Sequence, residues 1–220
     1  YTVLAEVEKW VQIQLHDDAY VAWIDRKLHT ELTEAEFEAQ LGEKHFVSVP
    51  LCSIQHINSN TPIRLSFGAQ LPKAKGLTFS IGKHQYRMEA NYCKAPALPI
   101  EEFALSVVNS PYMWGGKSIF GFDCSGFVQV FYSLYGYKLP RDAYQQEAFG
   151  TLISLKEAKS GALAFFINEK QKIFHVGIYL GNGQIIHASG KVRIDTLDEK
   201  GIYNETTKSY THLLHSLKTR

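Results

Sequence analysis

One cysteine and two histidines in the C-terminal half of the chain have the types and settings needed for nucleophilic catalysis. Cys124 lies in the segment GFDCSGF, residues 121–127, at the predicted start of a helix. Free N–H groups and the helix dipole lower the pKa of a thiol there. His175 and His187 lie in two predicted strands. A neutral His175 could take the thiol proton while His187 orients it, and the thiolate would attack an amide carbonyl to form a thioester that water hydrolyses. The backbone N–H of Cys124 is a natural oxyanion donor.

The same residues also have ordinary structural interpretations. A single cysteine at the start of a helix is more often structural than catalytic. Two histidines can lie half-buried in a sheet without sharing a role, and their spacing alone leaves this interpretation and the catalytic one open. The chain has nine histidines, and most of the others have the setting of surface or turn residues.

The turn between the two histidine strands decides whether the histidines can meet. It contains the Gly-Asn-Gly segment at residues 181–183. A two-residue turn with regular pairing would put His187 on the sheet face opposite to His175. A three-residue turn would put His187 opposite Gly177, on the face of His175, where the missing side chain of Gly177 leaves room for the His187 ring. The catalytic hypothesis therefore predicts the three-residue turn.

The elements that carry these residues are predicted to form an α+β domain. Helical periodicity predicts one helix from residue 100 and a second that begins near Cys124 and stops at Gly136. Apolar segments after it predict four strands, and helices followed by an antiparallel sheet are typical of the α+β class. The predicted strands are residues 161–167, 174–180, 184–189 and 192–197.

The chain changes character near residue 95. Residues 94–99 contain two prolines and are predicted to be a linker. Before them, short strand-like segments separated by Gly, Pro and Asn predict small all-β barrels. A helical insert is expected at about residues 33–41, where Thr33 and Glu36 have the spacing of a capping box. The predicted domains are residues 1–43, 44–95 and 96–220.

The composition is that of an ordinary globular protein. Of 220 residues, 45% are hydrophobic and 20% are charged, with a net charge of +1. Nothing in this balance favours a nucleic acid or an anionic membrane as a partner. No apolar segment is long enough to span a bilayer. The first residue is Tyr1 rather than Met, which indicates a processed or trimmed chain with any export signal upstream.

The two remaining cysteines, Cys52 and Cys93, have two interpretations. They either form a disulfide, which would leave Cys124 as the free thiol, or are small buried hydrophobic residues. The chain has three cysteines and no Cys-x-x-Cys pair, which argues against a zinc knuckle or a thioredoxin motif. Neither a metal nor a cofactor is expected.

Five short motifs follow one another in the second half of the chain: PYMWGG at 111–116, FDCSGF at 122–127, LPRD at 139–142, HVGIYLG at 175–181 and IHA at 186–188. In this order they resemble the NlpC/P60 family of bacterial cell-wall peptidases over roughly residues 98–217. The resemblance implies a minimal papain-like fold, with Cys124 on a helix packed against a sheet that carries His175 and His187. The segment before it is similar to bacterial SH3 domains: residues 1–43 resemble part of one with a helical insert, and residues 44–95 resemble a second.

Two SH3-like domains before such a domain resemble a subfamily that cuts the γ-D-glutamyl bond to a diamino acid in murein peptides with a free N-terminal L-Ala. The resemblance implies that Tyr112 lines the site and supports the oxyanion. Asp123 and Ser125 would contact the L-Ala-γ-D-Glu portion, with Asp123 suited to the amine. Arg141 would lie near the D-Glu carboxylate, and Tyr20 would close the amine end. The alternatives are that Asp123 only caps the helix and that Arg141 forms a surface ion pair.

Two other functions remain open at the level of the sequence. The chain could be a non-catalytic module that binds the cell wall, or a related Cys-His amidase or acyltransferase. As a peptidase it would take a murein peptide or a peptidoglycan stem peptide, with lysine or diaminopimelate as the diamino acid. Such a substrate implies a bacterial protein that is exported to the periplasm or envelope, with cytoplasmic recycling as the alternative.

Overall fold

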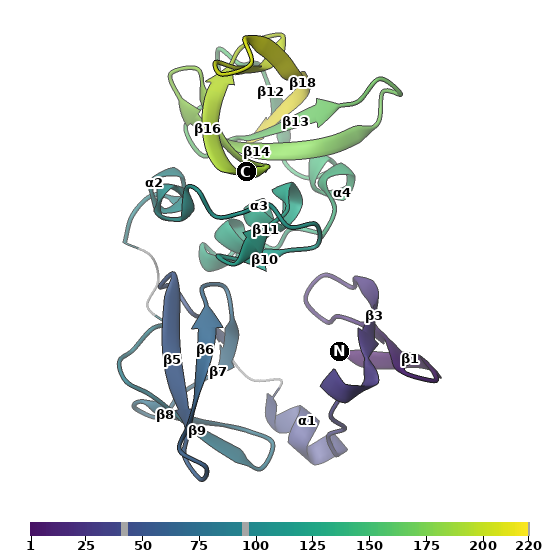
Figure 1. Ribbon diagram of the computed structural model, residues 1–220, viewed down its shortest axis with the longest axis vertical. Coiled ribbons are helices and arrows are strands. Elements are labelled where there is room, and N and C mark those ends of the chain that lie inside the picture. Colours follow the sequence, from purple (N-terminus) through teal and green to yellow (C-terminus); the bar gives the residue numbers. More distant parts are fainter. Residues whose placement is uncertain (41–43, 94–96, 220) are drawn as a thin grey trace. The chain divides into compact units, whose positions relative to one another are not determined.

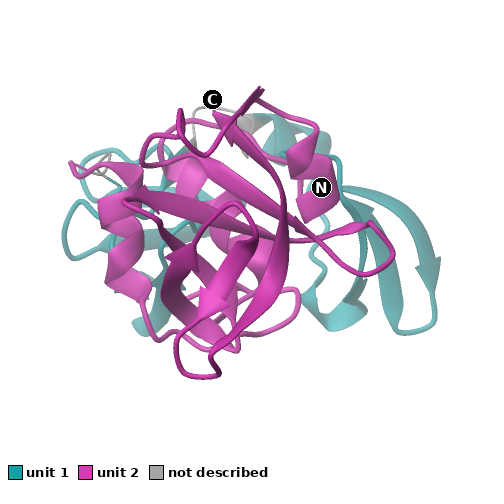
Figure 2. Ribbon diagram, turned by 90° about the horizontal axis from the view of Figure 1, so that it is seen from above, with its two compact units in different colours: residues 1–94 teal, residues 95–220 magenta. Residues whose placement is uncertain are grey.

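The computed structural model describes residues 1–40, 44–93 and 97–219. The chain forms two compact units, residues 1–94 and 95–220, coloured teal and magenta in Figure 2. The division falls where the sequence changes character. Residues 94–96 of the predicted linker and the predicted domain boundary at residue 43 lie outside the described residues. No described helix is both long enough and apolar enough to cross a membrane.

The first unit is rich in β-structure, as the sequence predicts, while its assignment as SH3-like barrels stays a prediction. Its first three strands form one sheet, a two-stranded and a four-stranded sheet follow, and the predicted insert is a helix. Thr33 and Glu36 form the predicted capping box. The elements are β1 (Thr2–Val7), β2 (Trp10–Gln14), β3 (Val21–Asp25), η1 (Arg26–Leu28), α1 (Glu34–Gln40), β4 (Lys44–Phe46), β5 (Leu51–His56), β6 (Thr61–Ser66), β7 (Gln70–Pro72), β8 (Thr78–Ile81) and β9 (His84–Met88).

Cys52 and Cys93 are both free thiols. Cys52 is buried in an apolar cluster with Ile54, Phe79 and Met88, and Cys93 packs partly buried against it. The structure therefore contradicts the disulfide interpretation and supports the view that the two cysteines act as small hydrophobic residues.

The second unit combines short helices with one closed antiparallel sheet, which confirms the α+β class. Among its described residues, seven strands run in the order β12-β18-β13-β14-β15-β16-β17, and β18 also pairs with β17. Figure 1 labels β12, β13, β14, β16 and β18 of this curved sheet. The elements are α2 (Ile100–Ala104), η2 (Leu105–Val107), β10 (Lys117–Ser118), β11 (Gly121–Phe122), α3 (Cys124–Leu134), α4 (Ala143–Glu147), β12 (Thr151–Ile153), β13 (Leu163–Ile167), β14 (Ile173–Gly181), β15 (Gln184–Ser189), β16 (Lys191–Leu197), β17 (Gly201–Asn204) and β18 (Ser209–Thr219).

Helix α3 is the central helix of the second unit. It packs against β14 and β15, and Phe127 and Phe131 are fully buried. The Asp123 carboxylate accepts a hydrogen bond from the N–H of Gly126 and so caps the first turn. After the helix ends, Gly136 takes the left-handed conformation with φ +81°, which a glycine adopts without strain. These signals hold Cys124 at the N-terminus of α3, as the sequence predicts.

The prediction of a three-residue turn between β14 and β15 is wrong. Asn182 and Gly183 are the two central residues, with φ of 51° and 69°, and Gly181 pairs with Gln184. Positive φ at both central positions is the type I′ geometry that matches strand twist, and Asn-Gly is the dipeptide that adopts it most readily. The local preference of this dipeptide therefore decided the length of the turn.

A β-bulge beside the turn nevertheless brings the two histidines to one face of the sheet. The register shifts between Tyr179 and Gly181, so Tyr179 pairs with Ile185. Continued along the strands, this register sets His187 opposite Gly177. One extra residue in a strand has the same effect on register as one extra residue in a turn. His187 therefore lies opposite Gly177, as predicted, although the turn is shorter.

Candidate active site

Cys124 lies against the segment of β14 that carries His175. Its thiol donates a weak hydrogen bond to the carbonyl oxygen of Phe174, with the sulfur 3.9 Å away. The backbone N–H of Val176, on the other side of His175, also hydrogen-bonds toward the sulfur. The Cys124 side chain is buried. The helix N-terminus and the strand therefore bring the predicted nucleophile beside the predicted base.

His175 and His187 contact each other through their ring nitrogens. The distance from His175 Nε2 to His187 Nδ1 is 2.8 Å, and the two rings meet edge to face. Both side chains are buried. The geometry is the one that the triad hypothesis requires, because a hydrogen bond to Nε2 leaves Nδ1 of His175 as the nitrogen that can exchange a proton with Cys124.

Asp195 continues this chain of contacts, and the sequence analysis missed it. Its Oδ2 lies 3.0 Å from His187 Nε2. Arg193 pairs with the same carboxylate, with Nε 2.7 Å from Oδ2 and Nη2 donating to Oδ1 at 2.8 Å. The available signal was the alternation of β16: Arg193 pairs directly with His187, and every second residue of a strand faces the same side.

His212 is a third histidine at the site. Its ring centroid lies 4.2 Å from that of His175, and it also stacks on Phe174 at 5.4 Å. The sequence analysis placed it among surface or turn residues, but it lies on β18 and is half-buried. Burial lowers the pKa of His212 to about 4, to which the nearby His187 also contributes. His212 is therefore neutral where its ring packs against that of His175.

Burial has the largest effect on the pKa values of Cys124, the predicted nucleophile, and His175, the predicted base. It raises the pKa of Cys124, with the charge of Asp123 adding to the effect. The backbone N–H of Val176 on β14 and those of Ser125 and Cys124 at the helix start oppose it only in part. The helix N-terminus therefore acts in the expected direction, but burial outweighs it and the pKa of this thiol is raised. Burial also lowers the pKa of His175 well below its ordinary value, and His187 and His212 lower it further. The resting pair is thus a thiol beside a neutral imidazole.

The chain is similar to known proteins in both sequence and fold. A model described as the NlpC/P60 family matches residues 109–211. A protein of Bacillus subtilis (strain 168) named gamma-D-glutamyl-L-lysine dipeptidyl-peptidase is 32% identical over 221 residues, which cover 90% of this chain and 73% of the relative. The chain belongs to the NlpC/P60 family. It is a cysteine peptidase of that family.

Two further similarities extend over most of this NlpC/P60 chain. A Bacillus cereus protein with the same dipeptidyl-peptidase name is 26% identical over 234 residues, which cover 93% of the chain and 70% of the relative. The crystal structure of an NlpC/P60 family protein from Bacillus cereus ATCC 10987 matches with a TM-score of 0.81 at 22% identity, and covers 99% of this chain and 78% of that one. At this identity the match shows a common fold.

Asp123 makes many contacts within the NlpC/P60 domain. Its Oδ1 accepts from Gly126 N at 2.6 Å, from Ser125 Oγ and from Arg141 Nη1. Its Oδ2 accepts from Gly115 N at 2.8 Å and from Arg141 Nη2. A carboxylate has about four acceptor sites, so these donors favour the capping interpretation over a contact with a substrate amine. The contact with substrate stays a prediction.

Arg141 and Ser125 belong to the same buried group. Arg141 is only 9% exposed, and its Nη1 donates to Ser125 Oγ at 2.9 Å in addition to the ion pair with Asp123. The alternative of a surface ion pair is thus wrong in its location, because the pair is buried. Its charge is already balanced by Asp123, so the predicted role near a D-Glu carboxylate stays a prediction.

Tyr112 and Tyr20 lie in different units. Tyr112 is 38% exposed. Burial raises the pKa of Tyr112, and nearby Cys124 and Asp123 raise it further, so its hydroxyl is neutral and can donate a hydrogen bond. Tyr20 lies just before β3 in the first unit, and its carbonyl accepts from Leu15 N at 2.9 Å. Its predicted role at the amine end stays a prediction.

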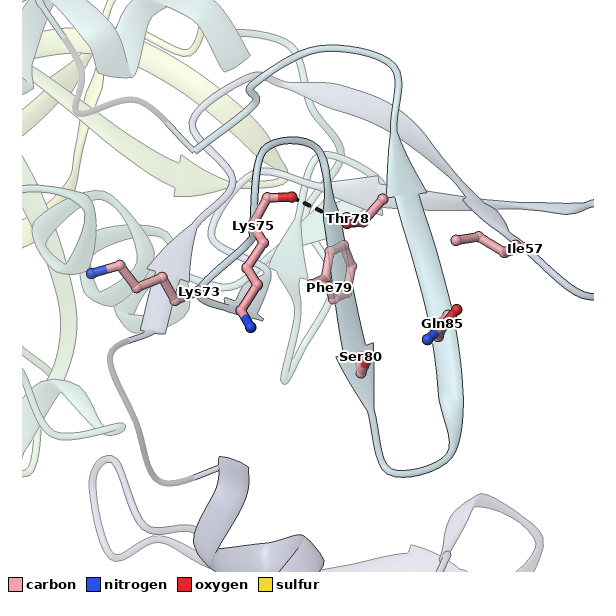
Figure 3. Close-up of a pocket in the computed structure, with 7 residues that line it drawn as sticks. All are labelled: Ile57, Lys73, Lys75, Thr78, Phe79, Ser80 and Gln85. Carbon is pink, nitrogen blue, oxygen red and sulfur yellow. Dashed lines mark hydrogen bonds between the residues drawn. The ribbon is translucent and has the colours of Figure 1, made fainter.

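The first unit carries two features that could suggest other sites. A pocket of about 370 Å³ is lined by residues of β8, β9 and the loop before β8, together with Ile57 just after β5. Figure 3 shows these lining residues. Its lining contains no histidine or carboxylate that could activate a hydroxyl. Elsewhere, the side chains of Glu6, His29 and Glu31 each have an atom that could coordinate a metal ion, and these atoms lie within 4.8 Å of one another. Arg26 already pairs with Glu6 at 2.6 Å, and both glutamates are exposed, so this group gives no evidence of a metal site.

Proposed function

We propose that this NlpC/P60 peptidase hydrolyses the γ-D-glutamyl amide bond to the diamino acid of murein peptides, through a thioester on Cys124. The observation that carries the proposal is the position of Cys124 against the strand of His175, whose far nitrogen contacts His187 at 2.8 Å. The choice of bond is supported by two relatives that align with 90% and 93% of the chain and are named gamma-D-glutamyl-L-lysine dipeptidyl-peptidases.

The geometry supports a general-base mechanism. His175 Nδ1 takes the proton of the Cys124 thiol as the sulfur attacks the amide carbonyl, because both groups are neutral at rest. The developing oxyanion can accept from the backbone N–H of Cys124 and from the Tyr112 hydroxyl. The His175 imidazolium then protonates the leaving amine of the diamino acid. Water, activated by the neutral His175, hydrolyses the thioester and restores the thiol.

We also propose that the enzyme requires a free N-terminal L-Ala. A dipeptidyl-peptidase releases two residues from an open N-terminus, and the relatives with this name align with the first unit as well as the second. Tyr20 remains a candidate residue for the amine end, whereas Asp123 is already engaged by donors of its own domain. Because the substrate is a murein peptide, we propose a bacterial, exported or envelope-associated protein.

The test is a digest of L-Ala-γ-D-Glu-L-Lys and of the matching diaminopimelate peptide, followed by mass spectrometry. We expect release of the free diamino acid and of the dipeptide L-Ala-γ-D-Glu. Cys124→Ala should abolish the reaction, while Cys52→Ala serves as a matched control in a buried cysteine of the other unit. A Cys124→Ala enzyme that cuts at the wild-type rate would exclude the thioester.

One further peptide and the chemical nature of the products separate the alternatives. Acetylation of the L-Ala amine should block cleavage, whereas undiminished activity would indicate a broader wall hydrolase. Products that carry a new ester or amide instead of a free carboxylate would indicate acyl transfer. Absence of any cleavage, together with binding to murein, would support the non-catalytic module.

A further inference from the structure

We propose that Asp195 is a positioning residue that sets the tautomers of both active-site histidines, so that the nucleophile-facing nitrogen of His175 is free to accept a proton. The inference deepens the proposed peptidase function and rests on it for its kinetic consequences. It is carried by a continuous series of buried contacts, from Asp195 through His187 to His175.

The first link fixes the proton on His187. An ionised carboxylate can only accept hydrogen bonds, so the 3.0 Å contact between Asp195 Oδ2 and His187 Nε2 requires the proton on Nε2. Burial alone would raise the pKa of Asp195, but hydrogen bonds to His187 and Arg193 outweigh it and hold this pKa below its ordinary value. Arg193 thus keeps the carboxylate ionised and available only as an acceptor.

The second link follows from the first. A neutral His187 with its proton on Nε2 has a bare Nδ1, which can only accept. The 2.8 Å contact with His175 therefore requires a proton on His175 Nε2. A neutral His175 protonated there has a bare Nδ1, which is the nitrogen left for the Cys124 proton. The carboxylate of Asp195 thus determines the proton position on His187, and His187 in turn determines the proton position on His175.

The same series stabilises the charge that forms during attack. When His175 takes the thiol proton, it becomes an imidazolium whose Nε2–H still donates to His187. His187 stays neutral, and its Nε2–H still donates to Asp195. No proton moves to Asp195, which acts through its fixed negative charge. A neutral third member would stabilise the imidazolium less, and here a carboxylate lies directly behind it.

Among the described residues, the other groups that face these rings form no hydrogen bond with them. His212 from β18 meets His175 and His187 through its ring, with centroids 4.2 Å and 5.6 Å away. Arg193 from β16 carries only donors, and Cys124 from α3 contacts the backbone on either side of His175. Among the described residues, Asp195 is the carboxylate that contacts His187.

The direct test is the tautomer of the wild-type histidines, read from the ring ¹⁵N chemical shifts by NMR. His175→Gln and His187→Gln assign the signals. We expect both rings to carry their proton on Nε2 at neutral pH. A wild-type His187 protonated on Nδ1 would overturn the proposal. This measurement needs neither substrate nor a folded Asp195 variant.

The second test is the rate at which iodoacetamide alkylates Cys124 in Asp195→Asn, followed by mass spectrometry of the peptide that contains Cys124. An asparagine can donate as well as accept, so His187 can reverse its tautomer and leave His175 protonated on Nδ1. We expect the rate near neutral pH to fall about 10-fold or more, and to approach the wild-type rate once pH exceeds the thiol pKa. A deficit that is the same at every pH would indicate a structural role and overturn the proposal.

The matched control is Asp198→Asn, the same substitution just beyond β16. Asp198 accepts from Tyr210 and from the N–H groups of Lys200 and Gly201, none of which belongs to the site. We expect this variant to keep the wild-type alkylation profile. A change equal to that of Asp195→Asn would show that the profile responds to any carboxylate of this region.

Kinetics give the third test. With a γ-D-glutamyl peptide, Asp195→Asn should lower kcat by about 10- to 100-fold with little change in KM. In a His187→Ala background, the same substitution should have no further effect, because the series is already broken. Full additivity of the two substitutions would overturn the proposal. If the wild type does not cut this peptide, the substrate proposal fails, while the NMR and alkylation results still decide the role of Asp195.

Discussion

Gly177 and His187 contact each other across the β14–β15 pair, and the absence of a side chain on one makes room for the other. A Cβ on Gly177 would lie 2.9 Å from the Cβ of His187 and 2.8 Å from Ile185 Cδ1. Because the His187 Cβ is fixed to the backbone of β15, it cannot yield as a flexible side chain does. The position of His187 against His175 thus depends on a glycine in the neighbouring strand.

We expect Gly177→Ala to displace His187 and lower activity more than its effect on stability explains. The overpacking should reduce the free energy of unfolding by about 1–3 kcal/mol, while kcat falls about 10-fold or more because the His175 tautomer is no longer held. Urea unfolding and steady-state kinetics measure the two effects.

Gly136→Ala is the matched control for that variant. A Cβ there would meet nothing within 4 Å, but its φ of +81° strains an alanine. This variant should therefore lose stability and keep the wild-type kcat. Equal loss of kcat in both variants would show that activity follows stability alone, and not the position of His187.

Removing the charge of Asp123 should destabilise the second unit. Asp123→Asn leaves the buried Arg141 without its counter-ion, and breaking a buried ion pair on one side costs about 3–5 kcal/mol. Thermal or urea unfolding checks this value. Asp142→Asn, at the N-cap position of α4, is the matched control and should have a much smaller effect.

The same variant discriminates between the two interpretations of Asp123. If the carboxylate bound the substrate amine, Asp123→Asn would raise KM for the free peptide and leave stability nearly unchanged. If it serves mainly as a cap and counter-ion, stability falls and the preference for the free over the acetylated peptide is retained. The contacts with Gly126, Gly115 and Arg141 favour the second outcome.

Tyr112→Phe should lower kcat with little effect on folding. The hydroxyl is a neutral donor near Cys124, and loss of one oxyanion donor lowers kcat by about 10²–10³-fold. Because Tyr112 is 38% exposed, water can replace part of the hydrogen bonding lost with the hydroxyl. We therefore expect the lower end of that range. Tyr144→Phe, 59% exposed on α4, is the control. An unchanged kcat in Tyr112→Phe would exclude the hydroxyl as an oxyanion donor.

The stability of the second unit should fall as pH is lowered from neutral. Burial lowers the folded-state pKa of His175, His187 and His212 below the value of 6.5 for the unfolded chain. Below pH 6.5 these histidines therefore bind protons in the unfolded state but stay neutral in the folded state. Each histidine can add up to about 1.4 kcal/mol of destabilisation per pH unit, and for His212 this ends near its folded-state pKa of about 4.

Urea unfolding at several pH values between about 7.5 and 5 measures this slope. His212→Asn should reduce this slope by the contribution of one histidine, because one of the three protons is no longer taken up on unfolding. His215→Asn, an exposed position three residues along the same strand, is the matched control. A stability that rises as pH falls through this window would contradict the burial of neutral histidines.

The sequence by itself determined the local features of the site. Asp123 and Gly136 delimit α3 because capping and the left-handed conformation are properties of one or two residues, so Cys124 could be placed at a helix start. The alternation around His175 and His187 likewise reports which residues share a strand face. These inferences hold because they depend on backbone preferences within a few residues of each position.

Only the tertiary structure decided how those elements meet. The predicted three-residue turn is wrong because turn length is not the sole determinant of register: the bulge between Tyr179 and Gly181 aligns the strands with a two-residue turn. Asp195 and His212 come from β16 and β18, and their contact with the histidine pair depends on strand order and sheet closure. The pKa of Cys124 followed the same logic: the helix start is local, but the burial that raises this pKa comes from the sheet packed over it.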